Sequence, residues 1–180
     1  MKSLIPLALA AFMIPGLLVA QDKRFDSSPV EQFDLSRYLG VWFEIARFDH
    51  SFERGLDNVT AEYLLRDDGK IDVINSGWKD GKYQVAEGKA KQPEPLDDPA
   101  HLKVSFFLFF YSDYNVMMLD DNYQIALVGS KSPSYLWILL RPPAVSTDVL
   151  DAVLKEASDR GYDTSRLIWV DQDMNKSIAL

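Results

Sequence analysis

The chain has 180 residues, 47% of them hydrophobic and 12% aromatic, with a formal net charge of −8 and a pI near 4.7. This composition is typical of one folded domain and excludes a disordered chain. The acidic balance argues against nucleic acid as a partner, because that binding depends on neutralising phosphates, and against a basic patch for anionic lipid. With no cysteine and two histidines, the sequence excludes disulfides and thiolate sites and leaves too few ligands for a histidine-rich metal site.

The first twenty residues predict a secretory signal peptide. Lys2 supplies a positive start, and the apolar run that follows is interrupted by prolines and a glycine, unlike a membrane-spanning helix. We expect cleavage after Ala20, followed by a polar lead-in over residues 21–34. Gln21 stands where a lipoprotein carries its lipid-modified cysteine, so lipid attachment at that position is excluded. The expected product is an exported, soluble protein of the periplasm or cell envelope.

Residues 35–172 predict one β-rich domain. Asp-Gly turns in "RDDGK" and "KDGK" favour tight hairpins, and the regular spacing of the strands favours an up-and-down barrel or a sandwich. A helix is predicted over Ser146–Gly161 and a short ninth strand over Arg166–Val170, which leaves 173–180 as a tail. Eight strand-like runs are separated by turn residues: 40–48, 58–65, 70–78, 82–91, 101–110, 114–119, 123–130 and 134–140.

Alternation along the strands assigns side chains to the two faces of the sheet. In the first strand, Trp42, Glu44, Ala46 and Phe48 share the inward set, so Glu44 needs a buried partner or contacts a polar part of a ligand. Arg47 has the opposite parity and is expected to face water. The run 134–140 is apolar on both faces, so the predicted helix should cover its outer face.

No catalytic residue, cofactor or metal ligand is predicted. The aspartate pairs lie in turns, where they are typical of solvated turn chemistry, whereas a catalytic pair of carboxylates faces a shared pocket. The sequence contains neither a glycine-rich phosphate loop nor a G-x-S-x-G motif.

An eight-stranded barrel is wide enough to hold its own side chains or one small ligand. The inward sets mix bulky apolar residues with small and polar ones, which favours a partly hollow interior, and a fully packed core is the alternative. The predicted cavity-lining residues are Glu44, Ala46, Phe48, Tyr63, Val73, Asn75, Val104, Phe106, Asn115, Met117, Val128, Tyr135, Trp137 and Leu139.

Three ordered segments, "GVW", "LDDNYQIALV" and "LLR", resemble the conserved blocks of the lipocalins, above all the bacterial outer-membrane lipocalins and apolipoprotein D. The resemblance covers about residues 35–172 and implies an eight-stranded antiparallel calycin barrel, closed at one end. It also implies that Gly40 and Trp42 lie at the closed end with Arg141 packed across Trp42. The run Asp120-Asp121-Asn122 departs from the Thr-Asp-Tyr that this family often shows.

By this resemblance the leading hypothesis is a non-enzymatic protein that carries or stores a fatty acid or lysophospholipid, in cell-envelope lipid maintenance under stress. The alternatives are a structural envelope protein with a filled barrel and a lipid-acting enzyme on the same scaffold. More apolar side chains follow Val104 than can all point inward, which indicates membrane contact, a homodimer or a lid at the mouth. The mouth residues are Phe52, Phe109, Phe110 and Tyr111.

Overall fold

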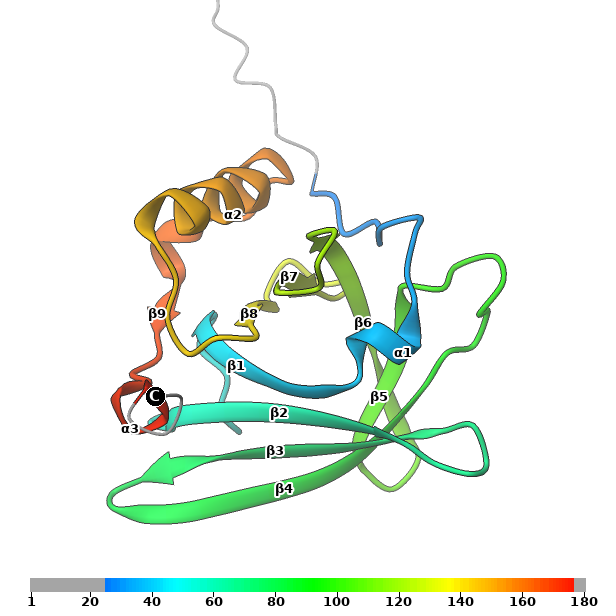
Figure 1. The fold of residues 1–180 in the computed structure, drawn as a ribbon, viewed down its shortest axis with the longest axis horizontal. Coiled ribbons are helices and arrows are strands. Elements are labelled where there is room, and N and C mark those ends of the chain that lie inside the picture. The colour runs from blue at the N-terminus through cyan, green and yellow to red at the C-terminus, as the bar shows by residue number, and fades with distance from the viewer. Residues whose placement is uncertain (1–24, 177–180) are drawn as a thin grey trace, which may run out of the picture.

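The computed structural model describes residues 25–176, so the predicted signal peptide and Gln21 lie outside the described part of the chain. Eight antiparallel strands form a closed barrel, because β1 pairs with β2 on one side and with β8 on the other (Figure 1). This confirms the predicted fold class. The strands are β1 (Gly40–Arg47), β2 (Asp57–Leu65), β3 (Ile71–Lys79), β4 (Lys82–Lys91), β5 (His101–Phe107), β6 (Phe110–Leu119), β7 (Ile125–Gly129) and β8 (Leu136–Leu140).

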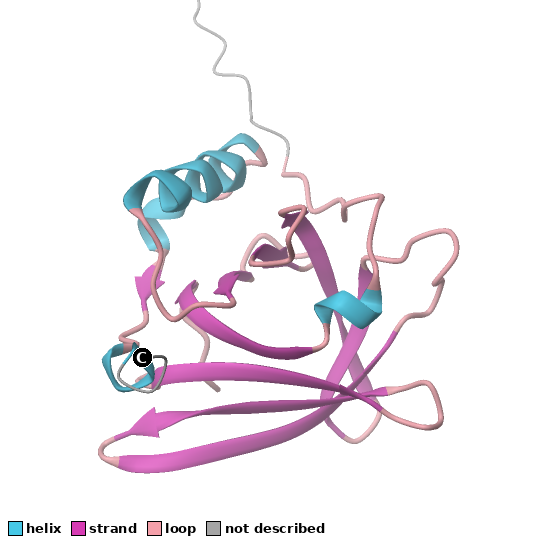
Figure 2. Ribbon diagram, in the orientation of Figure 1, coloured by secondary structure: helices cyan, strands magenta, loops and turns pink. Residues whose placement is uncertain are grey.

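The remaining elements lie outside the barrel. Helix α2 lies against one side of it, and the short ninth strand pairs with the end of β1 (Figure 2). Within residues 25–176, no helix has the length and apolar character needed to cross a membrane. These elements are α1 (Leu35–Tyr38), α2 (Thr147–Asp159), η1 (Thr164–Arg166), β9 (Ile168–Trp169) and α3 (Asp173–Lys176).

Two apolar clusters hold the fold together. One fills the barrel around Trp42 and Tyr63, and the other joins the outer faces of β1, β7 and β8 to α2 through Ile138, Val153 and Ala157. Burial of both faces explains why β8 is apolar on both sides, and the predicted covering helix is confirmed. In such a strand, alternation of polar and apolar residues cannot indicate which face points inward, because neither face is polar.

A β-bulge in β1 changes the predicted faces of its second half. The pairing with β8 shifts register between Glu44 and Ala46, so that Ala46 lies opposite Ile138 and Arg47 lies opposite Trp137. One extra residue in a strand reverses the side on which every later side chain points. The prediction that Arg47 faces water was therefore wrong: this side chain is 2% exposed and lies on the inner side.

The β5–β6 hairpin turns earlier than its sequence predicts. Strands over 101–110 and 114–119 with the turn between them were expected, whereas the structure turns at Leu108 and Phe109 and pairs Phe107 with Phe110. Leu108 has a φ of 48°, a left-handed conformation that leucine seldom adopts. A turn made of two large apolar residues carries none of the glycine, asparagine or aspartate that marks a turn in a sequence.

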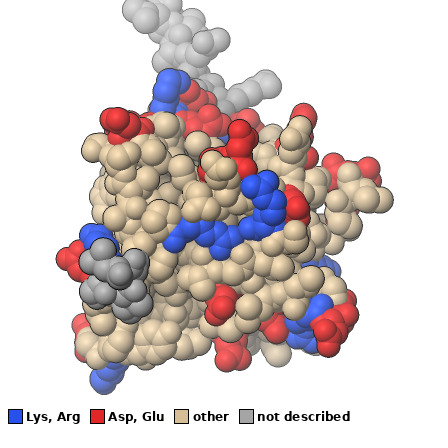
Figure 3. All heavy atoms as spheres, in the orientation of Figure 1, with Lys and Arg blue, Asp and Glu red and all other residues tan. Residues whose placement is uncertain are grey.

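The odd-numbered strands run toward the open end of the barrel and the even-numbered strands run toward the closed end. The connections after β1, β3, β5 and β7 therefore surround the mouth, and those after β2, β4 and β6 lie at the closed end with α1. Figure 3 shows Lys and Arg residues and Asp and Glu residues scattered over one face of the molecule, with residues of other types covering most of it.

Candidate functional site

The closed end of the barrel is plugged by Trp42, which is fully buried and donates from its indole nitrogen to the Tyr38 carbonyl at 2.8 Å. The guanidinium carbon of Arg141 lies 4.0 Å from the centroid of the Trp42 ring, as the resemblance implied. Arg141 also donates to the carbonyls of Val41 and Leu39, each at 2.7 Å. One cation thus stacks on the plug and holds the backbone at the start of β1.

Gly40 is required at this position for two reasons. Its φ is 91°, and a Cβ placed there would lie 3.3 Å from the Nη1 atom of Arg141. A side chain would therefore be strained by the backbone and would crowd the guanidinium that covers Trp42.

Three buried phenols lie beside this plug. The Tyr114 hydroxyl is 2.7 Å from the hydroxyls of both Tyr38 and Tyr63, so the oxygens form a short chain across the lower barrel. Burial raises the pKa of each of these phenols above its usual value. The lower barrel is consequently filled with neutral, hydrogen-bonded aromatic side chains.

The wall between the plug and the mouth is mainly apolar. Asn75 is one polar residue on it: its Oδ1 atom is buried without a hydrogen-bond partner, and its strand neighbours are Ala61 and Ala86. A buried carbonyl oxygen of this kind can accept a hydrogen bond from a donor inside the barrel. The apolar residues that face inward include Ala61, Val73, Leu102, Val104, Val116, Ala126, Val128 and Leu139.

A buried charged cluster lies where the wall meets the mouth. Arg47 donates from Nη1 to the Glu44 carboxylate at 2.6 Å and from Nη2 to the carbonyls of Glu53 at 2.7 Å and Leu56 at 3.2 Å. The Glu53 carboxylate in turn accepts from the indole nitrogen of Trp137 at 3.1 Å. Arg47 therefore connects the barrel wall to the loop that follows β1, and its Nε atom stays without a partner.

Two buried carboxylates lie close enough to the Arg47 guanidinium to interact with its charge, although only Glu44 is hydrogen-bonded to it. Burial, with the charge of Glu53 close by, raises the pKa of Glu44 to about 8 despite the opposing effect of Arg47. Burial also raises the pKa of Glu53. Near neutral pH the cluster consequently retains a proton that free glutamates would have lost.

Aromatic rings cover the charged cluster on the mouth side. The His50 ring is stacked on Phe52 at 5.2 Å and on Tyr135 at 4.8 Å between centroids, and it lies 4.9 Å from the centroid of Trp137. Burial and the charge of Arg47 lower the pKa of His50 to about 4, so the ring is neutral at pH 7. Its Nε2 atom is buried without a partner. The loop after β1 therefore packs into the mouth.

Four of the predicted cavity residues lie outside the barrel. Ala46 and Phe48 follow the bulge and pack in the cluster with α2. Met117 accepts a hydrogen bond from Tyr162 at 3.3 Å in the same cluster, and the Asn115 amide donates to the carbonyl of Ser27 at 2.8 Å. These four predictions are corrected: α2 and the N-terminal segment cover these positions.

The other predicted residues lie on the barrel wall or at its mouth. Phe106 lies against Gly88 on the inner side, where a Cβ on that glycine would be 2.7 Å from the ring. Phe109, Phe110 and Tyr111 lie on the β5–β6 hairpin. The wall residues Glu44, Tyr63, Val73, Val104, Val128 and Leu139 are in the interior, with Asn75 beside them and with Tyr135 and Trp137 near the mouth.

Sequence reasoning missed four participants: Tyr38, Tyr114, His50 and Glu53. Tyr114 shares its parity with the inward-facing Val116, a signal that was present but ambiguous in a strand that is apolar on both faces. His50 and Glu53 lie in an irregular loop, where no periodicity indicates which side chains turn inward.

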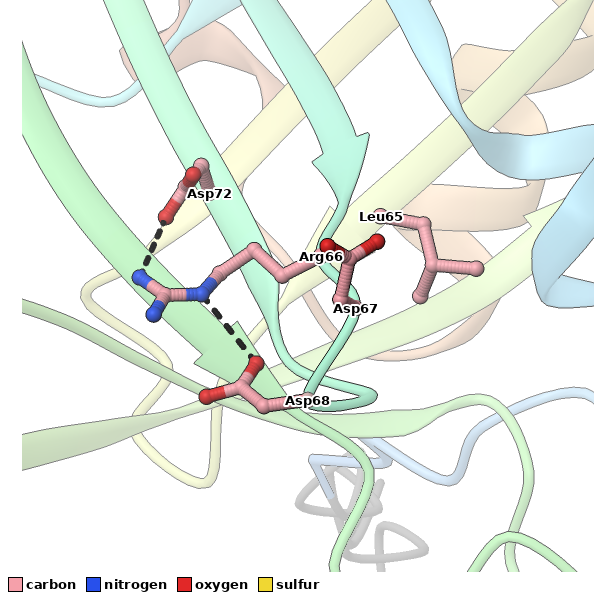
Figure 4. Close-up of a pocket in the computed structure, with 5 residues that line it drawn as sticks. All are labelled: Leu65, Arg66, Asp67, Asp68 and Asp72. Carbon is pink, nitrogen blue, oxygen red and sulfur yellow. Dashed lines mark hydrogen bonds and ion pairs between the residues drawn. The ribbon is translucent and has the colours of Figure 1, made fainter.

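A polar depression of about 460 Å³ lies at the β2–β3 turn, far from this interior (Figure 4). Arg66 crosses it and pairs with Asp68 and Asp72, each at 3.1 Å. Because these exposed charges satisfy one another, the depression shows no sign of a ligand site. Among the described residues, no group of three histidine or carboxylate side chains is arranged to hold a metal ion.

A closed barrel with a plugged floor, a mainly apolar wall and a polar cluster at its mouth defines a barrel of the class that takes up small hydrophobic molecules. The chain belongs to the lipocalin family: a family model described as a lipocalin-like domain matches residues 33–172. This confirms the resemblance seen in the sequence, and the family is one of binding and transport proteins.

Individual relatives agree with this assignment. The chain is 47% identical to outer membrane lipoprotein Blc of Escherichia coli over 171 residues, which cover 94% of this chain and 96% of that relative. It is 32% identical to apolipoprotein D of Macaca fascicularis over 156 residues, 82% of each chain. Among solved structures, insecticyanin from the tobacco hornworm Manduca sexta superposes with a TM-score of 0.69 at 26% identity, covering 82% of this chain and 85% of that one.

Proposed function

We propose that this protein binds one single-chain lipid, a fatty acid or a lysophospholipid, inside the barrel and carries or stores it in the cell envelope. The observation that carries the proposal is the order of side chains along the inner wall. Apolar residues such as Val73 and Leu139 extend from the Trp42 plug toward a polar cluster at the mouth. A molecule with an apolar chain and a polar end matches this order.

The energy of burial favours a chain of moderate length. Each buried CH₂ contributes about 0.8 kcal/mol, so ten methylenes give a gross gain of about 8 kcal/mol. Loss of translational and conformational freedom reduces that gain. We expect dissociation constants in the micromolar range or below.

The polar end of the ligand has candidate partners on the wall and at the mouth. The Oδ1 atom of Asn75 and the Nε atom of Arg47 are buried and lack partners. Glu44 and Glu53 place carboxylates beside the same guanidinium, which disfavours a second fully ionised carboxylate in the immediate neighbourhood. A lysophospholipid head group, which has both hydrogen-bond acceptors and a cation, therefore fits better than a bare carboxylate.

The envelope location is supported by the relatives and by the predicted signal peptide. The relatives from Escherichia coli and Vibrio cholerae are named outer membrane lipoproteins. The proposed role is maintenance of envelope lipids under stress, without catalysis.

Lipid binding is tested by native mass spectrometry of the exported protein and by thermal melts with lysophosphatidylethanolamine, oleate and a buffer blank. Co-purified lipid of defined mass, or an increase in Tm that saturates with lipid concentration, supports the proposal. An empty barrel whose Tm ignores both lipids contradicts it.

A structural protein with a filled barrel is the second candidate, favoured by the tyrosines and Trp42 that fill the lower half of the barrel. Val104→Trp separates the two, because a large ring on the inner wall should block a ligand. Val85→Trp, on the half-exposed outer face of β4, is the matched control. A carrier loses the Tm increase in the first variant and keeps it in the second, whereas a filled barrel shows no increase with lipid in either.

A further inference from the structure

The turn between β5 and β6 exposes five consecutive apolar side chains, which we name the tip patch: Phe106, Phe107, Leu108, Phe109 and Phe110. Their exposed fractions run from 43% at Phe106 to 84% at Phe109. Together they present on the order of 600 Å² of apolar surface. Single exposed apolar residues are common on proteins, but a contiguous run at one protruding point marks an interaction site.

Folding of the hairpin does not account for this composition. Leu108 adopts a φ of 48°, where glycine, asparagine or aspartate would relieve strain. The same barrel uses such residues in the β3–β4 turn, at Asp80 and Gly81, which have φ values of 52° and 71°. The apolar turn therefore costs folding stability and solubility together.

The surroundings of the tip patch are those of a protein segment at a lipid–water boundary. The Nζ atom of Lys89 lies 5.8 Å from the ring centroids of Phe109 and Tyr111, and that of Lys91 lies 4.8 Å from the Tyr111 ring. In a bilayer, the acyl chains lie deepest, then the glycerol region, then the head groups. An apolar tip followed by a tyrosine and by lysines with apolar stems presents matching groups in the same order.

A small groove continues from the tip patch along β4. It has a volume of about 270 Å³, and Phe106, Phe107 and Leu108 form its apolar side. Its polar side carries cations and carboxylates together, namely Arg66, Lys89, Asp72 and Glu87. Arg66 and Asp72 already pair with each other there, so this side of the tip patch carries no cluster of free cations, and we expect no dependence on a purely anionic membrane.

The tip patch also lies at the end of the barrel where a ligand would enter, because the turn after β5 is one of the four connections around the mouth. The structure excludes a packed lid formed by this hairpin, since Phe107, Phe109 and Phe110 are each at least 67% exposed. The mouth is filled instead by the loop after β1, which carries His50 and Glu53.

We propose that the tip patch inserts into the surface of a phospholipid bilayer and holds the barrel mouth against it. A second copy of the chain is the less suitable partner, because a stable dimer buries about 800 Å² on each side and uses a broad complementary face. The tip patch is smaller and convex, a shape that deformable lipid accommodates. This surface goes beyond the proposed carrier function and does not require that any lipid occupy the barrel.

The test is flotation of the protein with vesicles of phosphatidylethanolamine and phosphatidylglycerol, in parallel with vesicles of phosphatidylcholine. Phe109→Glu should lower vesicle binding at least tenfold, because it places a charge at the most exposed point of the tip patch. Leu96→Glu is the matched control, since Leu96 is 93% exposed in the β4–β5 connection at the closed end. This control should bind vesicles like the unmodified protein, and melting curves check that both variants fold.

Two outcomes would overturn the proposal. The first is equal vesicle binding by Phe109→Glu and Leu96→Glu, or no binding by the unmodified protein at millimolar lipid. The second is a dimer in light scattering that Phe109→Glu converts to a monomer while neither the unmodified protein nor the variant binds vesicles, which assigns the tip patch to a second copy. Neither outcome bears on lipid binding in the barrel, which mass spectrometry reports separately.

Discussion

Glu44 and Arg47 are three residues apart in β1, yet both side chains lie on the inner side of the barrel and meet at 2.6 Å. In a regular strand, residues three apart point to opposite faces. The bulge between Glu44 and Ala46 removes that opposition and allows a buried hydrogen-bonded contact between the Glu44 carboxyl and the Arg47 guanidinium within one strand. Because Arg47 also holds the Glu53 and Leu56 carbonyls, the bulge couples the barrel wall to the mouth loop.

Replacing Arg47 alone should be strongly destabilising. Arg47→Met leaves Glu44 without its partner and frees the two loop carbonyls, so we expect a loss of about 3–5 kcal/mol in the free energy of unfolding. Urea denaturation measures it. The double variant Glu44→Leu/Arg47→Met removes both buried polar groups and should recover at least half of that loss. Additive effects of the two single changes would contradict the coupling.

The raised pKa of Glu44 predicts how stability depends on pH. Between about pH 5 and pH 8 the folded protein keeps a proton that the unfolded chain releases, so the free energy of unfolding falls as pH rises. Glu44→Gln should flatten this decline by roughly 1–3 kcal/mol across the range, because one pKa unit corresponds to about 1.4 kcal/mol and Glu53 takes up part of the effect. Urea denaturation from pH 5 to pH 8.5 measures both slopes, and equal slopes would count against the assignment.

The barrel was predictable from the sequence because its signals are local: Asp-Gly turns and spaced apolar runs mark the strands. The closed end was predicted from the resemblance to the lipocalins, which implied the contact between Trp42 and Arg141. The polar cluster was not predictable, since one inserted residue in β1 reverses the parity of Arg47. The tip patch was recognised as unusual, but its turn position was wrong because Leu108 and Phe109 carry no turn signal.

The prediction of which β6 side chains point inward was wrong for a different reason. Asn115 and Met117 were expected inside, whereas Tyr114 and Val116 face the interior. The outer face of β6 is covered by α2 and the N-terminal segment, so both sides of this strand are buried. Alternation of polar and apolar residues identifies the inward-facing side chains only where one face of the strand is exposed to water.

The tyrosine chain predicts unequal effects of two similar changes. Among these three tyrosines, Tyr114 is hydrogen-bonded to both Tyr38 and Tyr63, whereas Tyr63 is hydrogen-bonded to Tyr114 alone. Tyr114→Phe should therefore cost about 2 kcal/mol in the free energy of unfolding and Tyr63→Phe about 1 kcal/mol. Urea denaturation of the two variants tests the order, and a larger loss for Tyr63→Phe would show that the hydroxyl chain is not centred on Tyr114.

The plug at the closed end should contribute to stability and leave ligand preference unchanged. Trp42→Ala opens a large cavity in the floor and should cost about 3–5 kcal/mol. Arg141→Lys keeps the charge but loses the planar fork that reaches Val41 and Leu39 while stacking on the indole, so we expect a loss of about 1–2 kcal/mol. Arg141→Ala should cost more than Arg141→Lys, because the main-chain carbonyls then lose every hydrogen bond donated by this side chain.

If these residues served the ligand and not the fold, the two arginine variants would change the relative Tm increases with oleate and lysophosphatidylethanolamine while the unfolding free energy stayed the same. We expect the reverse: lower stability in all three variants, with the ranking of the two lipids preserved.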